Sequence, residues 1–535
     1  MKRKNFVNLG SILCVVILFV ITLSCKNKNT SSVFSTENIV EEALYRPNFH
    51  FTPKANWMND PNGMFYLNGK YHLYFQYYPD GNVWGPMHWG HAISKDMITW
   101  QEQPIAIYPD DLGLIFSGSS VVDTNNTSGF GKEGVVPIVA IYTYHNMKGE
   151  KAGDLDFQTQ AIAYSLDEGM TWAKYENNPV ISNPGIKDFR DPKVIWNAAS
   201  SKWILTLAAA DKVLFYSSTN LKEWKLESEF GKDLGQHDGM WECPDLFPIK
   251  IAGTDQTKWV LLVSINPAAP NGGSGTQYFV GDFDGSHFTV DPDFKVQLAE
   301  QNALWVDYGR DNYAGVTWSN IPEQDGRKLF IGWMSNWEYA REVPTETWRS
   351  AMTIPRELKL QNFKNSYVLT SAPVAELLSY VSKTILKEKL VVNQKKTIIS
   401  KDEVDLSRIG VQLELNNLTE NTYTFLFHNT TGDSLSFGLN NREKNYFLNR
   451  QKSGRVAFSD KFANTISIAK KTTPSSSLQV KVLVDKTSIE VFYNDGETVM
   501  TEIFFPNKPF EFFSILTSDD QLILENVKIV EFEFN

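Results

Sequence analysis

Short runs of alternating apolar and polar residues, or of β-branched and aromatic residues, dominate the chain from about residue 50 onward. Residues 71–75 and 202–207 are two such runs, and Gly, Pro, Asn and Asp separate them from their neighbours. A period of two residues is typical of strands, because successive side chains point to opposite faces of a sheet. Helical periodicity is scarce, so the pattern predicts an all-β fold.

A weak internal repeat joins a short polar turn to an aromatic residue. Its copies are Ser94-Lys95-Asp96 before Trp100, Ser165-Leu166-Asp167 before Trp172, Ser218-Thr219-Asn220 before Trp224, and Asp282-Phe283-Asp284 before Phe288. One copy alone would indicate no more than a hairpin turn. Four copies in order, irregularly spaced, are typical of a β-propeller with insertions in its loops.

The pattern changes near residue 360. Residues 361–385 are predicted to be a linker with one helical turn, and residues 386–535 continue as short strands without Trp. The turn Asn494-Asp495-Gly496 lies between two alternating runs, which is a strong hairpin signal. We therefore expect a propeller over residues 46–360 and a β-sandwich domain over residues 386–535.

The start of the chain has the features of an export signal. Lys2, Arg3 and Lys4 precede an uncharged, mostly apolar stretch over residues 7–24, which ends at Cys25. This arrangement resembles a bacterial lipoprotein signal, so we expect a signal peptide over 1–24, lipidation of Cys25 and a flexible tether over 25–45. The expected location is the cell envelope, with the chain lipid-anchored to a membrane on the periplasmic or outer side. An ordinary cleaved signal and an uncleaved anchor are the alternatives.

Composition narrows the class of protein. The chain of 535 residues is 42% hydrophobic and 21% charged, which indicates a globular protein. Its net charge is −11, with no basic block after the first residues, so nucleic acid is not an expected partner. The 15 Trp, 21 Tyr and 34 Phe suit sheets and sugar-stacking sites. Of three Cys, Cys14 leaves with the signal and Cys25 carries lipid, so Cys243 has no disulfide partner.

Three carboxylates stand next to prolines. They are Asp60 before Pro61, Asp191 before Pro192, and Glu242 two residues before Pro244. Proline restricts the residue before it to extended geometry and lacks an N–H group, so each acid lies at a rigid, non-helical position. Apolar neighbours raise a carboxyl pKa and an adjacent Arg lowers it. Such a set can supply both the proton donor and the ionised group of glycoside hydrolysis, so the residues predict a carbohydrate-active propeller.

The segment Asn56-Trp57-Met58-Asn59-Asp60-Pro61-Asn62-Gly63 resembles the opening motif of glycoside hydrolase family 32, which comprises invertases, inulinases and levanases. The resemblance covers about residues 50–535. Further segments agree in order and spacing: 75–79, 84–92, 116–119, Arg190-Asp191-Pro192, Glu242-Cys243-Pro244, 311–314, 332–337 and 355–358.

The resemblance implies a five-bladed propeller with the site in its central funnel, and a retaining, double-displacement mechanism. It implies that Asp60 is the nucleophile, Glu242 the general acid/base and Asp191 the transition-state stabiliser. It also implies that the terminal fructose contacts Asn59, Gln76, Trp84, Phe116, Ser117, Arg190, Asp311 and Trp333. No cofactor or catalytic metal is implied. His88 and His91 could suggest a metal pair, but no third ligand lies at a recognisable spacing.

The expected activity is release of terminal β-D-fructofuranosyl residues from fructans such as levan and inulin, and from sucrose-type fructosides. Asp60 before Pro61 favours exo-action, since endo-inulinases often have Glu before the Pro. The alternatives are an endo-acting levanase, a fructosyltransferase on the same scaffold, and an inert sugar-binding propeller. Loops over 143–157 and 267–277 are expected to set the linkage preference.

Overall fold

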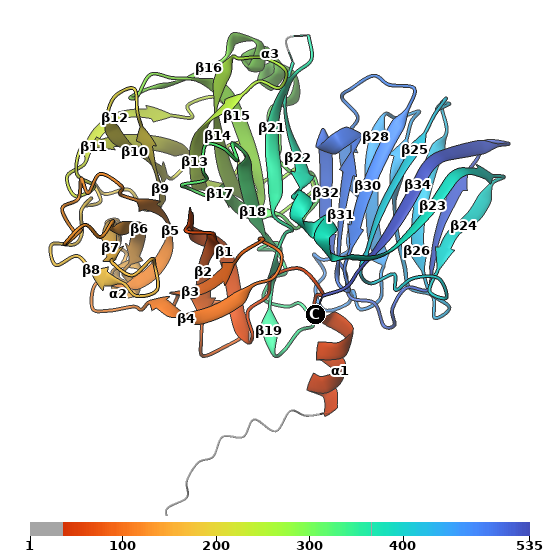
Figure 1. The fold of residues 1–535 in the computed structure, drawn as a ribbon, viewed down its shortest axis with the longest axis horizontal. Coiled ribbons are helices and arrows are strands. Elements are labelled where there is room, and N and C mark those ends of the chain that lie inside the picture. The colour runs from red at the N-terminus through yellow and green to blue at the C-terminus, as the bar shows by residue number, and fades with distance from the viewer. Residues whose placement is uncertain (1–35, 365, 535) are drawn as a thin grey trace, which may run out of the picture.

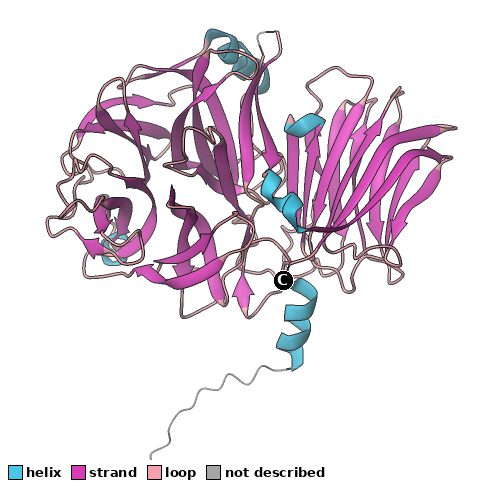
Figure 2. Ribbon diagram, viewed as in Figure 1, coloured by secondary structure: helices cyan, strands magenta, loops and turns pink. Residues whose placement is uncertain are grey.

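The computed structural model describes residues 36–364 and 366–534. Five sheets arranged in a ring lie beside two sheets packed face to face (Figures 1 and 2). This architecture confirms the predicted all-β fold, a five-bladed propeller followed by a sandwich. The predicted signal peptide and Cys25 lie outside the described residues.

Each blade of the propeller is one antiparallel sheet, apart from the short parallel contact of β19 with β1. The blades comprise β19 (Trp348–Arg349), β1 (Asn56–Leu67), β2 (Lys70–Tyr78), β3 (His88–Ser94) and β4 (Gln101–Ile107); β5 (Leu114–Val122), β6 (Ile138–His145), β7 (Gln158–Ser165) and β8 (Ala173–Lys174); β9 (Phe189–Asn197), β10 (Lys202–Ala209), β11 (Lys212–Ser218) and β12 (Lys225–Phe230); β13 (Met240–Lys250), β14 (Thr257–Asn266), β15 (Gly275–Phe283) and β16 (Phe288–Val290); and β17 (Tyr313–Thr317), β18 (Lys328–Met334), β20 (Ala351–Met352), β21 (Arg356–Asn362) and β22 (Tyr367–Pro373).

The first strand of every blade lies at the centre of the ring. β1, β5, β9, β13 and β17 contact one another in sequence, and β17 returns to β1. The chain closes the ring after β18, because β19 pairs with β1 of the first blade and β20 pairs with β18 of the fifth. Five strands from distant parts of the sequence therefore meet around one axis.

The predicted turn repeat follows the third strand of the first four blades. In each copy a side-chain oxygen accepts hydrogen bonds from backbone N–H groups two to four residues further on; the accepting residues are Asp96, Asp167, Asn220 and Asp284. Asn and Asp form such turns readily because their short side chains mimic a backbone carbonyl. The repeat is thus the hairpin that starts the outermost strand of a blade.

The C-terminal domain packs two six-stranded sheets against each other. One contains β23 (Val381–Val392), β34 (Leu522–Phe532), β25 (Ile409–Leu415), β30 (Leu478–Val484), β31 (Ser488–Tyr493) and β32 (Thr498–Ile503); the other contains β24 (Lys395–Ser400), β33 (Phe512–Thr517), β26 (Thr422–His428), β27 (Ser434–Asn440), β28 (Asn445–Lys452) and β29 (Ser467–Lys470).

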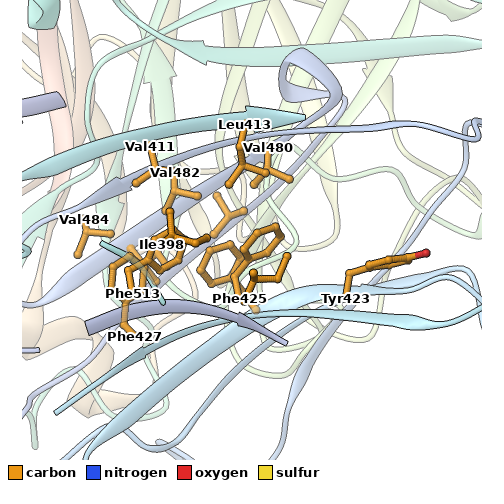
Figure 3. Packing of buried hydrophobic residues seen from close by; sticks show 14 of the residues in the cluster. Ile398, Val411, Leu413, Tyr423, Phe425, Phe427, Val480, Val482, Val484 and Phe513 are labelled. Atoms are coloured by element: carbon orange, nitrogen blue, oxygen red, sulfur yellow. The ribbon is translucent and has the colours of Figure 1, made fainter. Parts of the chain in front are cut away.

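Alternation along these strands builds the core of the sandwich. Tyr423, Phe425 and Phe427 of β26 are buried in the core of the sandwich, in one cluster with Val480 and Val482 of β30 (Figure 3). The residues between them on β26 are only half-buried. The hairpin predicted around residues 494–496 is present, because β31 and β32 pair with Tyr493 opposite Thr498 and the turn η2 (Asn494–Gly496) joins them.

Two expected boundaries differ from the structure. The linker was expected to begin at residue 361, but β22 pairs along β21 as the outer strand of the fifth blade. A single 3-10 turn, η1 (Ala375–Tyr380), then leads directly into β23. The tether was expected to extend to residue 45, but α1 (Thr36–Tyr45) is a helix. It is held because Tyr45 packs in an apolar cluster with Phe505, and Arg46 lies 3.7 Å from the ring centre of Trp348.

The remaining helices are α2 (Met147–Ala152) and α3 (Pro292–Gln301). None of the helices in the described residues is long and apolar enough to cross a bilayer.

Buried ions join the propeller to the sandwich. Both ring nitrogens of His50 form hydrogen bonds with carboxylates of the sandwich. Nδ1 lies 2.8 Å from Asp485 and Nε2 lies 2.8 Å from Glu490. Arg356 of β21 pairs with Glu490 and, at 2.9 Å, with Asp307. Burial alone would lower the pKa of His50, but hydrogen bonds and charge from the two sandwich carboxylates outweigh it and raise that pKa to about 9.

This site predicts how stability depends on pH. A histidine whose pKa is raised on folding stabilises the fold below its unfolded pKa of about 6.5 and loses that contribution as pH rises through the folded value. The free energy of unfolding should therefore fall between about pH 6.5 and 9, by up to about 3 kcal/mol. Urea unfolding at pH 6 and pH 9 measures the difference.

The matched variants are His50→Gln, which should remove most of this pH dependence, and His287→Gln, which changes an exposed histidine and should retain it. Equal stability of the unmodified chain at both pH values would contradict the prediction.

Candidate active site

All five inner strands lose regular pairing at the same level of the ring. The breaks in register lie between Met58 and Pro61 in β1, Ile115 and Gly118 in β5, Arg190 and Lys193 in β9, Glu242 and Asp245 in β13, and Tyr313 and Val316 in β17. A bulge of this kind bends a strand and re-aims its side chains. Prolines at three of the breaks have no N–H group to leave unpaired. The acids beside prolines in the sequence are thus the acids at the bulges.

The bulges surround an open cavity of about 530 Å³ at the centre of the propeller. Its lining residues are Asn59, Asp60, Gln76, Trp84, Phe116, Ser117, His145, Glu150, Phe157, Gln158, Lys187, Asp188, Arg190, Asp191, Met240, Glu242, Asn266, Trp337 and Arg341. The three predicted acids therefore come together, although β1, β9 and β13 are far apart in the sequence.

Asp60 is fixed by neighbours on two strands. Its Oδ2 accepts a hydrogen bond of 2.7 Å from Ser117 Oγ of β5, and its Oδ1 accepts one of 3.0 Å from Asn59 Nδ2. Asn59 is itself held, since Trp57 Nε1 donates to its Oδ1 at 2.7 Å. Burial raises the pKa of Asp60, and the hydrogen bond from Ser117 opposes the rise. The carboxylate is held in one orientation toward the cavity.

Glu242 lies between a cation and a phenol. Arg190 donates to its Oε1 from Nε at 3.2 Å and from Nη2 at 3.0 Å. Tyr313 of β17 donates its hydroxyl to Oε2. Burial and the charge of Glu242 raise the pKa of Tyr313 well above its usual value, so the phenol stays a hydrogen-bond donor. Both carboxyl oxygens of Glu242 are thus oriented.

Asp191 and Asp60 are bridged by Cys243. The Cys243 backbone N donates to Asp191 Oδ2 at 3.1 Å, and its Sγ lies 3.6 Å from that oxygen and 3.8 Å from Asp60 Oδ2. Burial, opposed by the charge of Arg190 and aided by the charges of Glu242 and Asp60, raises the pKa of Asp191 to about 7. Burial and the same carboxylates raise the pKa of the Cys243 thiol well above its usual value. The thiol is therefore a neutral neighbour of the acids and not a nucleophile.

Aromatic rings and fixed polar groups both line the cavity. The ring of Trp84 meets that of Phe116 edge-on at 6.0 Å, and Phe116 stacks on His145 at 4.1 Å. Gln76, buried on β2, donates from Nε2 to Asn62 and to the Ile115 carbonyl. Apolar faces combined with a few fixed polar groups suit a sugar ring. Six of the predicted pocket residues line this cavity: Asn59, Gln76, Trp84, Phe116, Ser117 and Arg190.

Two predicted pocket residues, Asp311 and Trp333, do not line the cavity. Asp311 is fully buried at the domain interface, where Arg450 donates to its Oδ2 at 2.6 Å and Tyr339 to its Oδ1 at 2.7 Å. Trp333 lies on β18, the second strand of its blade, and packs behind Tyr313 and Trp337. From this part of the chain, the lining residues are Trp337 and Arg341, which follow β18.

Sequence reasoning missed several lining residues. Trp337 lines the cavity and Tyr313 donates to Glu242, yet neither was predicted as a site residue, although both lie inside the family-like segments 311–314 and 332–337. Of the two loops expected to set linkage preference, the first contributes His145, Glu150 and Phe157, whereas the second contributes none and only its neighbour Asn266 lines the cavity. Loop residues such as Lys187 and Arg341 carry no periodic signal by which to find them.

The two histidines considered for a metal have other neighbours. His91 Nε2 lies 3.1 Å from His72 Nδ1, and His88 Nδ1 lies 3.0 Å from the Pro86 carbonyl. Within residues 36–364 and 366–534, no three His, Cys, Asp or Glu side chains are grouped so that they could hold a metal ion.

Comparison with known proteins agrees with both domains. Residues 50–373 match the N-terminal domain of the glycosyl hydrolases family 32, and residues 376–531 match the C-terminal domain of that family. The levanase of Bacillus subtilis (strain 168) is 47% identical over 468 residues, covering 87% of this chain and 67% of that protein. An extracellular exo-inulinase of Aspergillus niger is 41% identical over 492 residues, covering 86% and 90%.

A solved structure shares the whole architecture. A fructofuranosidase variant from Schwanniomyces occidentalis, complexed with fructosylnystose, superposes with a TM-score of 0.82 at 34% identity and covers 92% of this chain and 99% of that one. With matches to both domains across residues 50–531, the chain belongs to the glycosyl hydrolases of family 32.

Proposed function

We propose that this glycosidase is a retaining β-fructosidase that releases terminal fructosyl units from levan, inulin and sucrose-type fructosides. The observation that carries the proposal is the convergence of Asp60, Asp191 and Glu242 on one cavity around Arg190 and Cys243. The names of the relatives, a levanase and an exo-inulinase, and the fructosylnystose bound in a similar structure support this substrate class.

In the first step Asp60 attacks the anomeric carbon of the fructosyl unit. The bond from that carbon to the leaving oxygen breaks, an ester to Asp60 forms, and Glu242 gives its proton to the leaving oxygen. In the second step Glu242 takes a proton from water, the resulting hydroxide displaces Asp60, and fructose leaves. Ser117 and Asn59 hold Asp60 in the orientation that this attack requires.

Asp191 acts as the transition-state stabiliser by holding sugar hydroxyls. Its bulge gives it a positive φ of 64°, and Cys243 N fixes its Oδ2. The positive charge of Arg190, close to both Asp191 and Glu242, offsets the repulsion among the three buried carboxyl groups.

An Asp60→Asn variant distinguishes an enzyme from an inert sugar-binding protein. Loss of hydrolysis is expected, and unchanged hydrolysis would overturn the enzymatic proposal.

The shape of the cavity supports exo-action. Trp84, Phe116 and Trp337 are among its lining residues, and the three acids come from the inner strands. Aromatic faces beside a few fixed polar groups suit a single terminal sugar ring. Endo-cleavage and transfer to another sugar are the alternatives on the same scaffold.

Replacing the proton donor should separate the two chemical steps. Glu242→Gln keeps the shape of the side chain but has no acidic proton to transfer, so hydrolysis of sucrose should fall on the order of 10²–10⁴-fold. A fructoside with a very good leaving group should restore the first step. Steady-state rates on both substrates check this, and an equal loss on both would assign Glu242 another role.

Early products distinguish exo-action from its alternatives. On levan and on inulin, fructose should be the only product during the first few per cent of the reaction. Chromatography of a time course measures this. A ladder of oligosaccharides would establish endo-cleavage, and products longer than the starting sugar would establish transfer.

We also propose that Cys25 is lipidated and anchors the enzyme in the cell envelope. The basic residues Lys2, Arg3 and Lys4 and the apolar stretch before Cys25 support this. A lipidated cysteine carries more than one acyl chain, which gives stable anchoring. The unmodified chain expressed in bacteria should partition into detergent, whereas Cys25→Ala should stay in the aqueous phase; detergent partitioning of Cys25→Ala would contradict the anchor.

A further inference from the structure

The loop between β14 and β15, residues 267–274, begins beside the cavity and contacts the sandwich in its middle. Asn266, which lines the cavity, immediately precedes it. Further along, Asn271 Nδ2 donates to the Ile468 carbonyl at 3.0 Å, and its Oδ1 accepts from Ile468 N at 2.9 Å. Ile468 lies on β29, the edge strand of its sheet. One side-chain amide thus pairs both backbone groups of an edge residue, as a neighbouring strand would.

The same loop holds the segment that carries Trp337. Asn336 Nδ2 donates to the Gly272 carbonyl at 3.3 Å, and Trp337 N donates to Ser274 Oγ at 3.2 Å. The approach is close, because a Cβ added at Gly273 would lie 1.9 Å from Asn336 Oδ1. A shift of the loop therefore cannot occur without a shift of residues 336–337.

Trp337 in turn contacts the groups that hold the proposed nucleophile. Its ring stacks on Trp57 at 5.8 Å, and Trp57 donates to Asn59, which donates to Asp60. A continuous series of contacts runs from β29 through Asn271 and Trp337 to the cavity. Asn271 also donates to the Tyr308 carbonyl at 2.7 Å, which ties the loop to the chain before β17.

We propose that Asn271 is a positioning residue, through which the sandwich fixes Trp337 and so sets the sugar-binding shape of the cavity. The inference rests on the proposed function, since the sugar is the fructosyl unit. Asn271 itself does not line the cavity, and it acts only through the loop. The sandwich then contributes to substrate binding although it supplies none of the lining residues.

Asn48 provides a matched control. It too is a half-buried asparagine that joins the N-terminal part of the chain to the sandwich, with Nδ2 donating to the Ser407 carbonyl at 2.8 Å and to Asp485 at 3.0 Å. It contacts neither the loop nor residues 336–337. Asn48→Ala and Asn271→Ala should therefore lower the melting temperature by similar amounts, while only Asn271→Ala should weaken sugar binding.

The experiment measures KM and kcat on sucrose, and fructose binding by calorimetry in the Glu242→Gln background. Asn271→Ala should raise KM and the fructose Kd by about three- to tenfold, the size of one displaced aromatic contact, with kcat within about twofold. Asn48→Ala should leave KM and the fructose Kd unchanged. An unchanged KM in Asn271→Ala, or an equal rise in Asn48→Ala, would overturn the positioning role.

Two further measurements keep the test independent of folding losses and of the substrate. Ser274→Ala removes the acceptor for Trp337 N, so its effect on KM should not add to that of Asn271→Ala if both act through one loop; full additivity would count against the proposal. A crystal structure of Asn271→Ala should show Trp337 displaced, and an unmoved side chain would overturn the inference. An unmodified enzyme inactive on every β-fructoside would instead overturn the proposed function alone.

Discussion

The active site depends on one constraint: five bulged strands must meet at the same level of a closed ring. Each inner strand alone places at most two polar side chains at the cavity, and regular pairing would turn alternate residues away from the axis. The bulges re-aim Asp60, Ser117, Asp191, Glu242 and Tyr313 toward a common centre. Proline at three bulges removes the N–H that would otherwise lose its partner. The catalytic side chains therefore meet because strand pairing is interrupted at these positions.

Gathering three carboxyl groups in a buried place has an electrostatic cost. Arg190 offsets much of it by pairing with Glu242 and lying 4.0 Å from Asp191, while the neutral Cys243 thiol separates Asp191 from Asp60. The groups consequently have different surroundings: a phenol and a guanidinium on Glu242, a hydroxyl and an amide on Asp60, and a backbone N–H on Asp191. Different surroundings allow chemically similar acids to take separate roles.

The sandwich is more than a neighbour of the propeller. Buried charges at His50, Arg356 and Glu490 require a partner from the other domain, because an unpaired ion in this place would be strongly destabilising. Through Asn271 the sandwich edge also contacts the loop that holds Trp337. Interface and cavity therefore share structural elements, which gives a physical reason for the two domains to occur together in one chain.

Local signals in the sequence determined much of this protein. Alternation gave the all-β class, the polar turns marked the hairpins of four blades, and the prolines beside Asp60, Asp191 and Glu242 marked the bulges, since strand period and turn chemistry act over a few residues. The number of blades and the residue roles came from family resemblance. Only the tertiary structure decided that Asp311 pairs with Arg450, that Trp337 and not Trp333 reaches the cavity, and that His145 and Glu150 line it. Which side chain faces the axis depends on strand position in the ring and on contacts across hundreds of residues, and no local pattern carries that information.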